Sequence, residues 1–182
     1  MQTVSQATED VSYVTGTHSS RANQIARALI VAGILPKSSG RDIKKISAKE
    51  LLPLLAAVAM ADKVADAAQV ARAFIDLPLE GNAGTLSEAF AVMIEKRDVW
   101  KRAEIEFSKQ HSGYTAIIRG LIRQDDEDIE LTLPFWRDRS WGHFSKTSFT
   151  ISAEGIEVLR NLFARDYTED MRHSLSTEGP RT

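Results

Sequence analysis

The hydrophobic pattern changes from a helical to an alternating period partway along the chain, and this change most strongly limits the folds available to it. In the first half, apolar residues recur at the spacing of one helix face, for example at Ile25, Leu29 and Ala32. In the second half, apolar and polar residues alternate, as in 129–133, which is typical of strands with one buried face. We therefore expect an α+β fold: an N-terminal three-helix bundle followed by a helix, a small antiparallel sheet and a closing helix.

Turn and capping residues mark where the expected elements begin and end. Gly33 followed by Pro36 predicts a helix end near Ala32, because glycine adopts the left-handed conformation and proline prevents continuation. Capping boxes, in which a hydroxyl and a carboxylate exchange bonds with the backbone, are expected at residues 47–50 and 85–88. The other N-caps are expected at Ser19 or Ser20, at Asp62 or Asp66, and at Ser152.

These signals divide the chain into four segments. Residues 1–18 are polar with little apolar content, so we expect them to form a flexible arm. The remaining segments are expected to be a helical basic domain at 19–78, an α+β domain at 85–165 and a flexible tail at 166–182. Gly81 and Gly84 favour a boundary between the two domains.

The composition leads us to expect a soluble intracellular protein. With 182 residues, of which 43% are hydrophobic, the chain can bury one ordinary core or two small ones. No cysteine is present, which excludes disulfides and thiolate metal sites and fits a reducing compartment. The longest apolar run, at 51–61, is too short to span a membrane. The polar N-terminus lacks the apolar stretch of a secretory signal.

Positive charge is concentrated at residues 19–49, although the whole chain has a formal net charge of −2. This stretch holds one acidic residue and seven cationic ones: Arg21, Arg27, Lys37, Arg41, Lys44, Lys45 and Lys49. Cations gathered on one helical unit are typical of proteins that bind the phosphate backbone of nucleic acids. A solvated basic loop without function is the alternative. The interval 34–47 is too long for a strict helix-turn-helix motif, so no recognition helix is assigned.

The order of features over residues 20–78 resembles a group of uncharacterised phage and prophage proteins. The similarity lies in the runs IARAL (25–29) and AGILPK (32–37), followed by ISA (46–48) at the start of an Ala/Leu-rich helix. Those proteins similarly place a helix ending in Ala-Gly-Leu-Leu-Pro before a Gly-rich basic loop and a Leu-Thr-Pro-type helix start, where this chain has Ser-Ala. The resemblance implies a phage-derived context, and with it the cytoplasm of a bacterial host, without defining an activity.

A second candidate site is the segment 135–144, which combines aromatic and cationic side chains. Trp and Arg are enriched where proteins bind one another. We therefore expect a partner-binding site made of four residues: Trp136, Arg137, Arg139 and Trp141. The alternative is a hairpin connection whose tryptophans complete the core. The acidic turn at 125–128 argues against a nucleic-acid path here and favours a protein partner.

Signatures of catalysis are missing from the sequence. The four histidines, at positions 18, 111, 143 and 173, are scattered and show no metal-ligand spacing. No phosphate-binding or nucleophile-elbow motif occurs. The acidic turn resembles the start of a calcium loop but lacks the required glycine. We therefore expect no enzyme activity, no cofactor and no metal.

Together these features predict a phage-type DNA-binding protein that acts as a transcriptional regulator. It would hold the phosphate backbone through the basic loop and helix start at 37–49. The alternative is a phage-encoded protein-binding module or inhibitor that acts on a host protein complex through 135–144. Besides DNA, the expected partners are a host protein or a second copy of the chain, and no membrane partner is expected.

Overall fold

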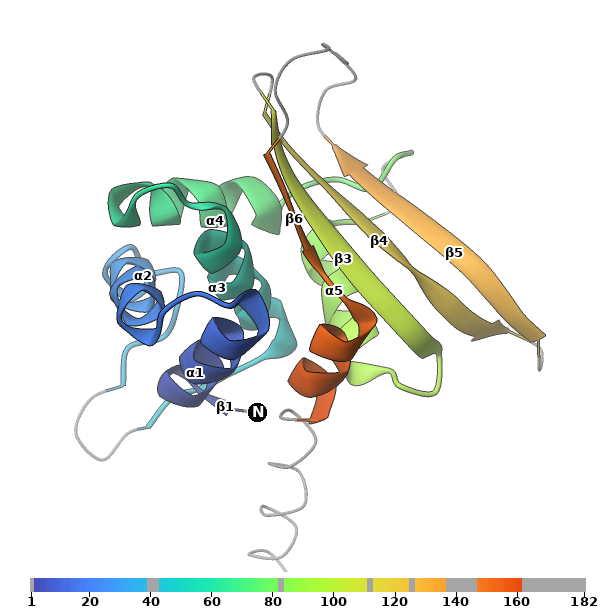
Figure 1. Cartoon of the computed structure of the whole chain (residues 1–182), viewed down its shortest axis with the longest axis horizontal. Coiled ribbons are helices and arrows are strands. Elements are labelled where there is room, and N and C mark those ends of the chain that lie inside the picture. The colour runs from blue at the N-terminus through green and yellow to red at the C-terminus, as the bar shows by residue number, and fades with distance from the viewer. Residues whose placement is uncertain are drawn as a thin grey trace, which may run out of the picture.

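In the computed structural model, the helices form one layer that lies against one face of an antiparallel sheet (Figure 1). The structure describes residues 2–38, 43–81, 84–110, 113–124, 127–136 and 147–161. In chain order its elements are β1 (Gln2–Thr3), α1 (Val4–Thr15), α2 (Ser19–Val31), β2 (Lys45–Ile46), α3 (Ala48–Met60), η1 (Val64–Asp66), α4 (Ala67–Ile75), α5 (Leu86–Glu95), β3 (Trp100–Gln110), β4 (Gly113–Gln124), β5 (Glu127–Trp136) and β6 (Thr147–Ile151). Residues 153–161 follow β6 as a helical segment, called here the closing helix. The predicted α+β fold is confirmed.

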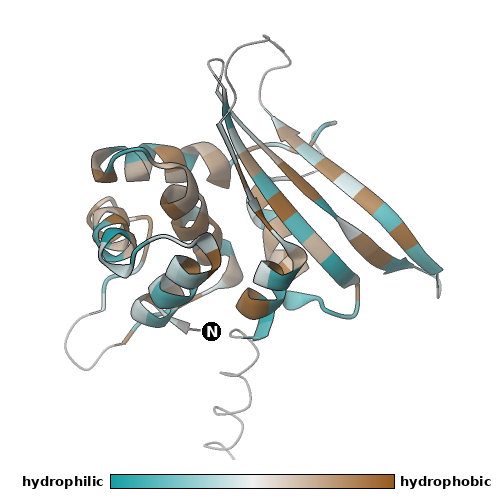
Figure 2. Cartoon of the chain, in the orientation of Figure 1, coloured by the Kyte–Doolittle hydropathy of each residue, from teal (hydrophilic) through white to brown (hydrophobic). Residues whose placement is uncertain are grey.

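α3 is the centre of the helical layer, because α1, α2, α4 and α5 all contact it. It begins where the sequence predicts: Ser47 is the N-cap and exchanges hydrogen bonds with Glu50 in a capping box. Leu51 and Leu55, one helical turn apart, are both fully buried, and Figure 2 shows apolar residues along most of this helix. Burial on several sides explains why α3 is apolar around most of its circumference.

The larger sheet has the strand order β5-β4-β3-β6, and every neighbouring pair is antiparallel. The predicted alternation is confirmed in β3, where Ala103, Ile105 and Phe107 are buried. The residues between them therefore lie on the opposite face of the sheet. Phe107 makes an edge-to-face contact with Phe74 of α4, with 5.1 Å between the ring centroids. The buried face of the sheet is thus the one that the helices cover.

β3 and β4 approach each other closely at Gly120. The pairing shifts its register between Trp100 and Arg102, which marks a β-bulge. A Cβ atom on Gly120 would lie 2.1 Å from the carbonyl oxygen of Arg102, far inside van der Waals contact. Glycine is therefore required here for the two strands to pair as they do.

The closing helix is joined to α5 by a buried arginine. Ser152 caps the helix as predicted, since its Oγ accepts a hydrogen bond from the Gly155 N–H at 3.3 Å. Arg160 is 1% exposed, and its Nε and Nη2 donate to the carbonyl oxygen of Met93 at 2.9 and 2.7 Å. Met93 belongs to the last turn of α5, where carbonyl groups have no partner within the helix. Arg160 supplies that partner.

The prediction of a flexible arm at 1–18 is wrong. Residues Val4–Thr15 form α1, which contacts both α2 and α3. Ala7 and Val11 on this helix are fully buried. The buried stripe also contains Thr8, whose hydroxyl donates to the carbonyl oxygen of Val4 at 2.7 Å. Because small and polar residues lie on its packed face, the hydrophobic pattern of the sequence did not predict this helix.

The ends of α2 and the start of α4 agree with the sequence in part. Gly33 has φ of 70°, which confirms the predicted left-handed end of α2. The N-cap of α2 is His18 and not Ser19, because His18 Nδ1 accepts from the Ser20 N–H at 3.2 Å. Asp66 occupies the N-cap position of α4, but its side chain makes no capping hydrogen bond.

The two predicted domains share one hydrophobic core. Buried apolar residues form a single cluster that extends from Ala7 to Leu159. The predicted boundary at 79–84 is a short connection beside the sheet, where Leu79 forms an isolated bridge with Phe135. The predicted tail at 166–182 lies outside the described residues, as do the last residues of the predicted α+β domain.

Candidate functional site

Four of the predicted cationic residues lie in the segments just before α3 and in its first turn. We call them the lysine segment, and they are Lys37, Lys44, Lys45 and Lys49. The Lys44 N–H donates to Ser38 Oγ at 3.0 Å, which brings the two ends of the intervening loop together. Lys45 lies in β2 opposite Thr3 of β1. All four lysine side chains are exposed.

The N-terminus of α3 already has an anion of its own. The Ser47 N–H donates to Glu50 Oε2 at 2.7 Å, and the Glu50 N–H donates to Ser47 Oγ at 3.3 Å. A carboxylate at this position satisfies the partial positive charge of the helix end. The helix end is therefore not an open phosphate site, and a polyanion would be held by the lysine side chains.

A carboxylate of the predicted α+β domain acts on the lysine segment. The pKa of Glu88 is lowered, first by hydrogen bonds from the backbone and side chain of Thr85, and in addition by the charge of Lys49. Glu88 is the capping carboxylate of α5, as predicted. It stays ionised down to lower pH than usual, so it offsets part of the positive charge near Lys49.

No described contact places the other predicted cationic residues beside the lysine segment. Arg21 donates through Nη2 to the carbonyl oxygens of Ala61 and Asp62, the latter at 3.1 Å, where α3 ends. At 1.5 Å per residue, this lies about 18 Å along the helix from Lys49. Arg27 is exposed on α2, and no described contact links it to the lysine segment. Arg41 lies outside the described residues.

The sheet presents a second polar surface on the face turned away from the helices, called here the open face. Arg119 of β4 bridges two carboxylates of β3: Nη1 lies 3.3 Å from Glu104 Oε1 and Nη2 lies 3.1 Å from Glu106 Oε2. Further along β4, Arg123 Nε lies 2.7 Å from Asp128 Oδ1 of β5. Both of these arginines are thus paired with acids, which offsets their positive charge toward a polyanion.

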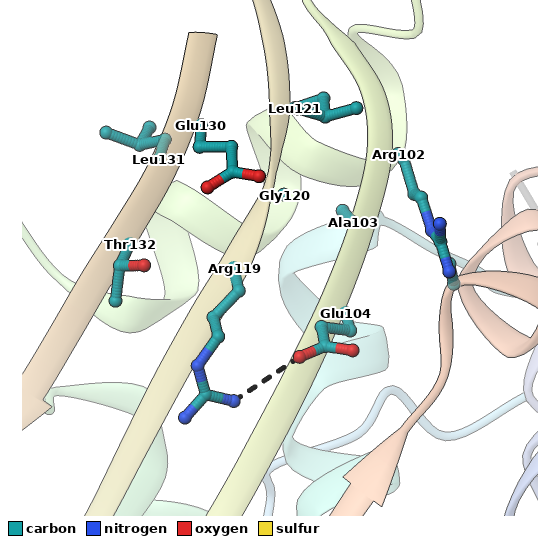
Figure 3. Close-up of a pocket in the computed structure, with 10 residues that line it drawn as sticks. Arg102, Ala103, Glu104, Arg119, Gly120, Leu121, Glu130, Leu131 and Thr132 are labelled. Atoms are coloured by element: carbon teal, nitrogen blue, oxygen red, sulfur yellow. Dashed lines mark hydrogen bonds and ion pairs between the residues drawn. The ribbon is translucent and has the colours of Figure 1, made fainter.

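A shallow depression of about 280 Å³ lies on the open face (Figure 3). Figure 3 shows Arg119, Glu104 and Glu130 around it, on three neighbouring strands. This surface was not predicted from the sequence. The alternation within 113–124 does place Arg119 and Arg123 on one side of a strand, but only the structure shows which side the helices leave uncovered.

The predicted partner-binding segment is only partly described. Trp136 is half-buried at the end of β5, and its N–H donates to the carbonyl oxygen of Pro78 at 3.1 Å. Arg137, Arg139 and Trp141 lie outside the described residues. The grouping of these four side chains therefore stays a prediction.

Within the ranges that the structure describes, no group of three or more potential ligands could hold a metal ion. None of the described helices combines the length and the apolar character needed to cross a membrane. No protein-family model, curated protein or solved structure matches this chain. The resemblance to phage proteins consequently stays a prediction.

Proposed function

We propose that this protein binds the phosphate backbone of DNA through the lysine segment and acts as a phage-type regulator. The observation that supports the proposal is the hydrogen bond between Lys44 N–H and Ser38 Oγ. It brings the chain next to Lys37 close to Lys44, which directly precedes Lys45 of β2, and Lys49 lies in the first turn of α3. Four exposed cations carried by this part of the fold would supply an electrostatic footprint for a phosphate chain.

We expect the protein to contact the DNA phosphates and not the edges of the bases. Lysine is a flexible point charge that neutralises phosphate without reading base edges. The lysine segment contains no Asn or Gln and no exposed aromatic residue that would supply such readout. Binding should therefore be nearly independent of DNA sequence, and any specificity would have to come from another part of the protein or from an assembly.

The test compares two variants with the same change in charge. The double variant Lys44→Ala and Lys45→Ala should weaken binding to AT-rich and GC-rich duplexes equally, by about tenfold or more at low salt. The matched control is Lys63→Ala with Lys96→Ala, which removes two exposed lysines from other parts of the surface. Equal losses in both double variants, or no loss in either, would contradict the proposed site.

The alternative function is a protein-binding module that acts on a host complex through 135–144. Among its predicted contact residues the structure describes Trp136, which is half-buried beside Pro78. A pull-down from host lysate with nuclease treatment would distinguish the two functions. Capture of a protein that survives nuclease and requires Trp136 favours the alternative.

A further inference from the structure

β5 is an edge strand whose outer side, among the described residues, is paired only at its 134–136 end. The Glu80 N–H donates to the carbonyl oxygen of Pro134 at 3.0 Å, and the Trp136 N–H donates to that of Pro78. Because backbone groups alternate in direction along a strand, Asp128, Glu130 and Thr132 point their N–H and C=O groups the same way. No described residue pairs with those three on that side. A stretch of β5 thus presents an unused set of strand hydrogen bonds.

An apolar groove lies beside this edge. It has a volume of about 260 Å³ and lies between α5 and β5, with Leu79, Val92 and Leu133 in its lining. Val92 is 44% exposed and Ile129, on the same side of β5, is 41% exposed. An added strand points every second side chain to this side of the sheet. Those side chains would cover the groove if they were apolar.

The other side of the edge is acidic. Asp128 and Glu130 point to this side of the sheet, and their side chains are exposed. Arg123 is paired with Asp128, whereas no ion pair involves Glu130 within the described part of the chain. The pKa of Asp128 is lowered mainly by its hydrogen bond with Arg123, and Lys101 adds to the effect. Complementary residues on an added strand would therefore be basic.

We propose that the free edge of β5 accepts an extended segment of a partner protein in which apolar residues alternate with Lys or Arg. The segment adds a fifth strand to the sheet and bonds to the backbone of Asp128, Glu130 and Thr132. Its apolar side chains enter the groove at Val92, and its cations face Glu130. This surface is separate from the lysine segment and would serve protein recognition.

A second copy of this chain is a poorer occupant of the edge. In a symmetric pair of β5 strands, the segment at 78–80 blocks one end of each edge. The registers centred on Ile129 or Glu130 avoid this segment, but both set acidic residues directly opposite each other, which is destabilising. The register centred on Leu131 sets Asp128 opposite Pro134, whose carbonyl oxygen is already bonded.

The probe is an acetylated seven-residue peptide in which Lys and Val alternate, and its control has the same residues in blocks. Binding is measured by fluorescence anisotropy, and backbone protection by hydrogen–deuterium exchange. The alternating peptide should bind at least tenfold more tightly than the block peptide. It should also slow exchange at Glu130 and Thr132.

Two variants locate the interaction. Thr132→Pro removes an outward N–H and leaves the pairing with β4 intact, because proline is tolerated at such edge positions. Val92→Lys places a cation in the groove at a site that is already exposed. Each should weaken peptide binding by about tenfold or more, while thermal unfolding stays cooperative and the variants Lys44→Ala and Lys45→Ala leave peptide binding unchanged.

Three results would overturn the proposal. The first is equal affinity for the alternating and block peptides, and the second is binding that neither Thr132→Pro nor Val92→Lys changes by more than twofold. The third is a dimer in sedimentation experiments that Thr132→Pro dissociates, because it would show that a second copy occupies the edge.

Discussion

Arg160 shows how much of this fold depends on one side chain. Its guanidinium group is buried, and two of its nitrogens donate to the carbonyl oxygen of Met93 while a third pairs with Glu157. A buried cation is tolerated only when its donors have partners. The sequence gives no sign of this role, because an arginine on an amphipathic helix is usually exposed.

We expect Arg160→Ala to lower the free energy of unfolding by about 2–3 kcal/mol, because the Met93 carbonyl group loses its partner inside the protein. Glu157→Gln is the matched control: Glu157 is 45% exposed, so its loss should cost less than about 1 kcal/mol. Urea denaturation measures both. Equal effects of the two substitutions would show that Arg160 does not hold the closing helix as described.

Gly120 is a second position where a single side chain is expected to affect stability. We expect Gly120→Ala to destabilise the protein by about 2–3 kcal/mol, since an added Cβ forces β3 and β4 apart. The control is Thr132→Ala on the exposed surface of the neighbouring strand. An unchanged unfolding midpoint for Gly120→Ala would mean that the strands are not held at this separation in solution.

At the scale of elements, the sequence predicted what depends on local chemistry. The capping boxes at Ser47 and Thr85 and the helix end at Gly33 are all where expected, because each is set by a few neighbouring residues. The alternation in β3 likewise gave the strand and its buried face. It could not give the strand order, since the position of β6 beside β3 depends on contacts distant in sequence.

α1 is the element that the local sequence pattern did not predict. We expect Val11→Asp to lower the free energy of unfolding by about 3–4 kcal/mol, because it places a charge in the core. Tyr13→Asp is the matched control on the same helix, where Tyr13 is 77% exposed, and it should be nearly neutral. Urea denaturation of both variants tests whether α1 is part of the folded core. If both substitutions are neutral, residues 1–18 behave as the flexible arm that the sequence predicted.

At the scale of the whole molecule, the helical layer and the sheet share a core and are also joined by a polar link at Asp62. Lys109 of β3 lies 2.6 Å from the Asp62 carboxylate just after α3, and Arg21 of α2 bonds to the carbonyl oxygen of the same residue. The pKa of Asp62 is lowered, mainly by the hydrogen bond from Lys109, and the pKa of Lys109 is raised by the same contact. Three elements therefore meet at Asp62.

This link makes stability depend on pH. A carboxylate with a lowered pKa in the folded state stabilises the protein above its unfolded-state value, which for Asp62 is 3.8. That contribution is lost as the pH falls through the folded-state pKa. The wild type should therefore lose stability below about pH 4, and Asp62→Asn should show a smaller loss. Urea midpoints between pH 7 and pH 3 check this, and identical pH profiles would rule out a contribution from the link.

At the candidate site, the sequence predicted the amount of positive charge but not its arrangement in space. The excess of cations at 19–49 was visible, but their convergence was not, because it depends on where the helices place them. Arg21 bonds to the end of α3 that lies away from Lys49, and Arg27 is exposed elsewhere on α2. The hydrogen bond between the Lys44 N–H and Ser38 Oγ brings the two ends of the loop together, and no feature of the sequence predicts it.

The most direct test of the proposed function is the salt dependence of binding to a generic 20-base-pair duplex, followed by fluorescence anisotropy between 50 and 200 mM salt. Four phosphate contacts from the lysine segment predict a slope of log K against log[salt] of about −3 to −4. The variant with Lys44→Ala and Lys45→Ala should show a slope shallower by about 2. No binding at 50 mM salt, or identical slopes for the wild type and this variant, would contradict the account.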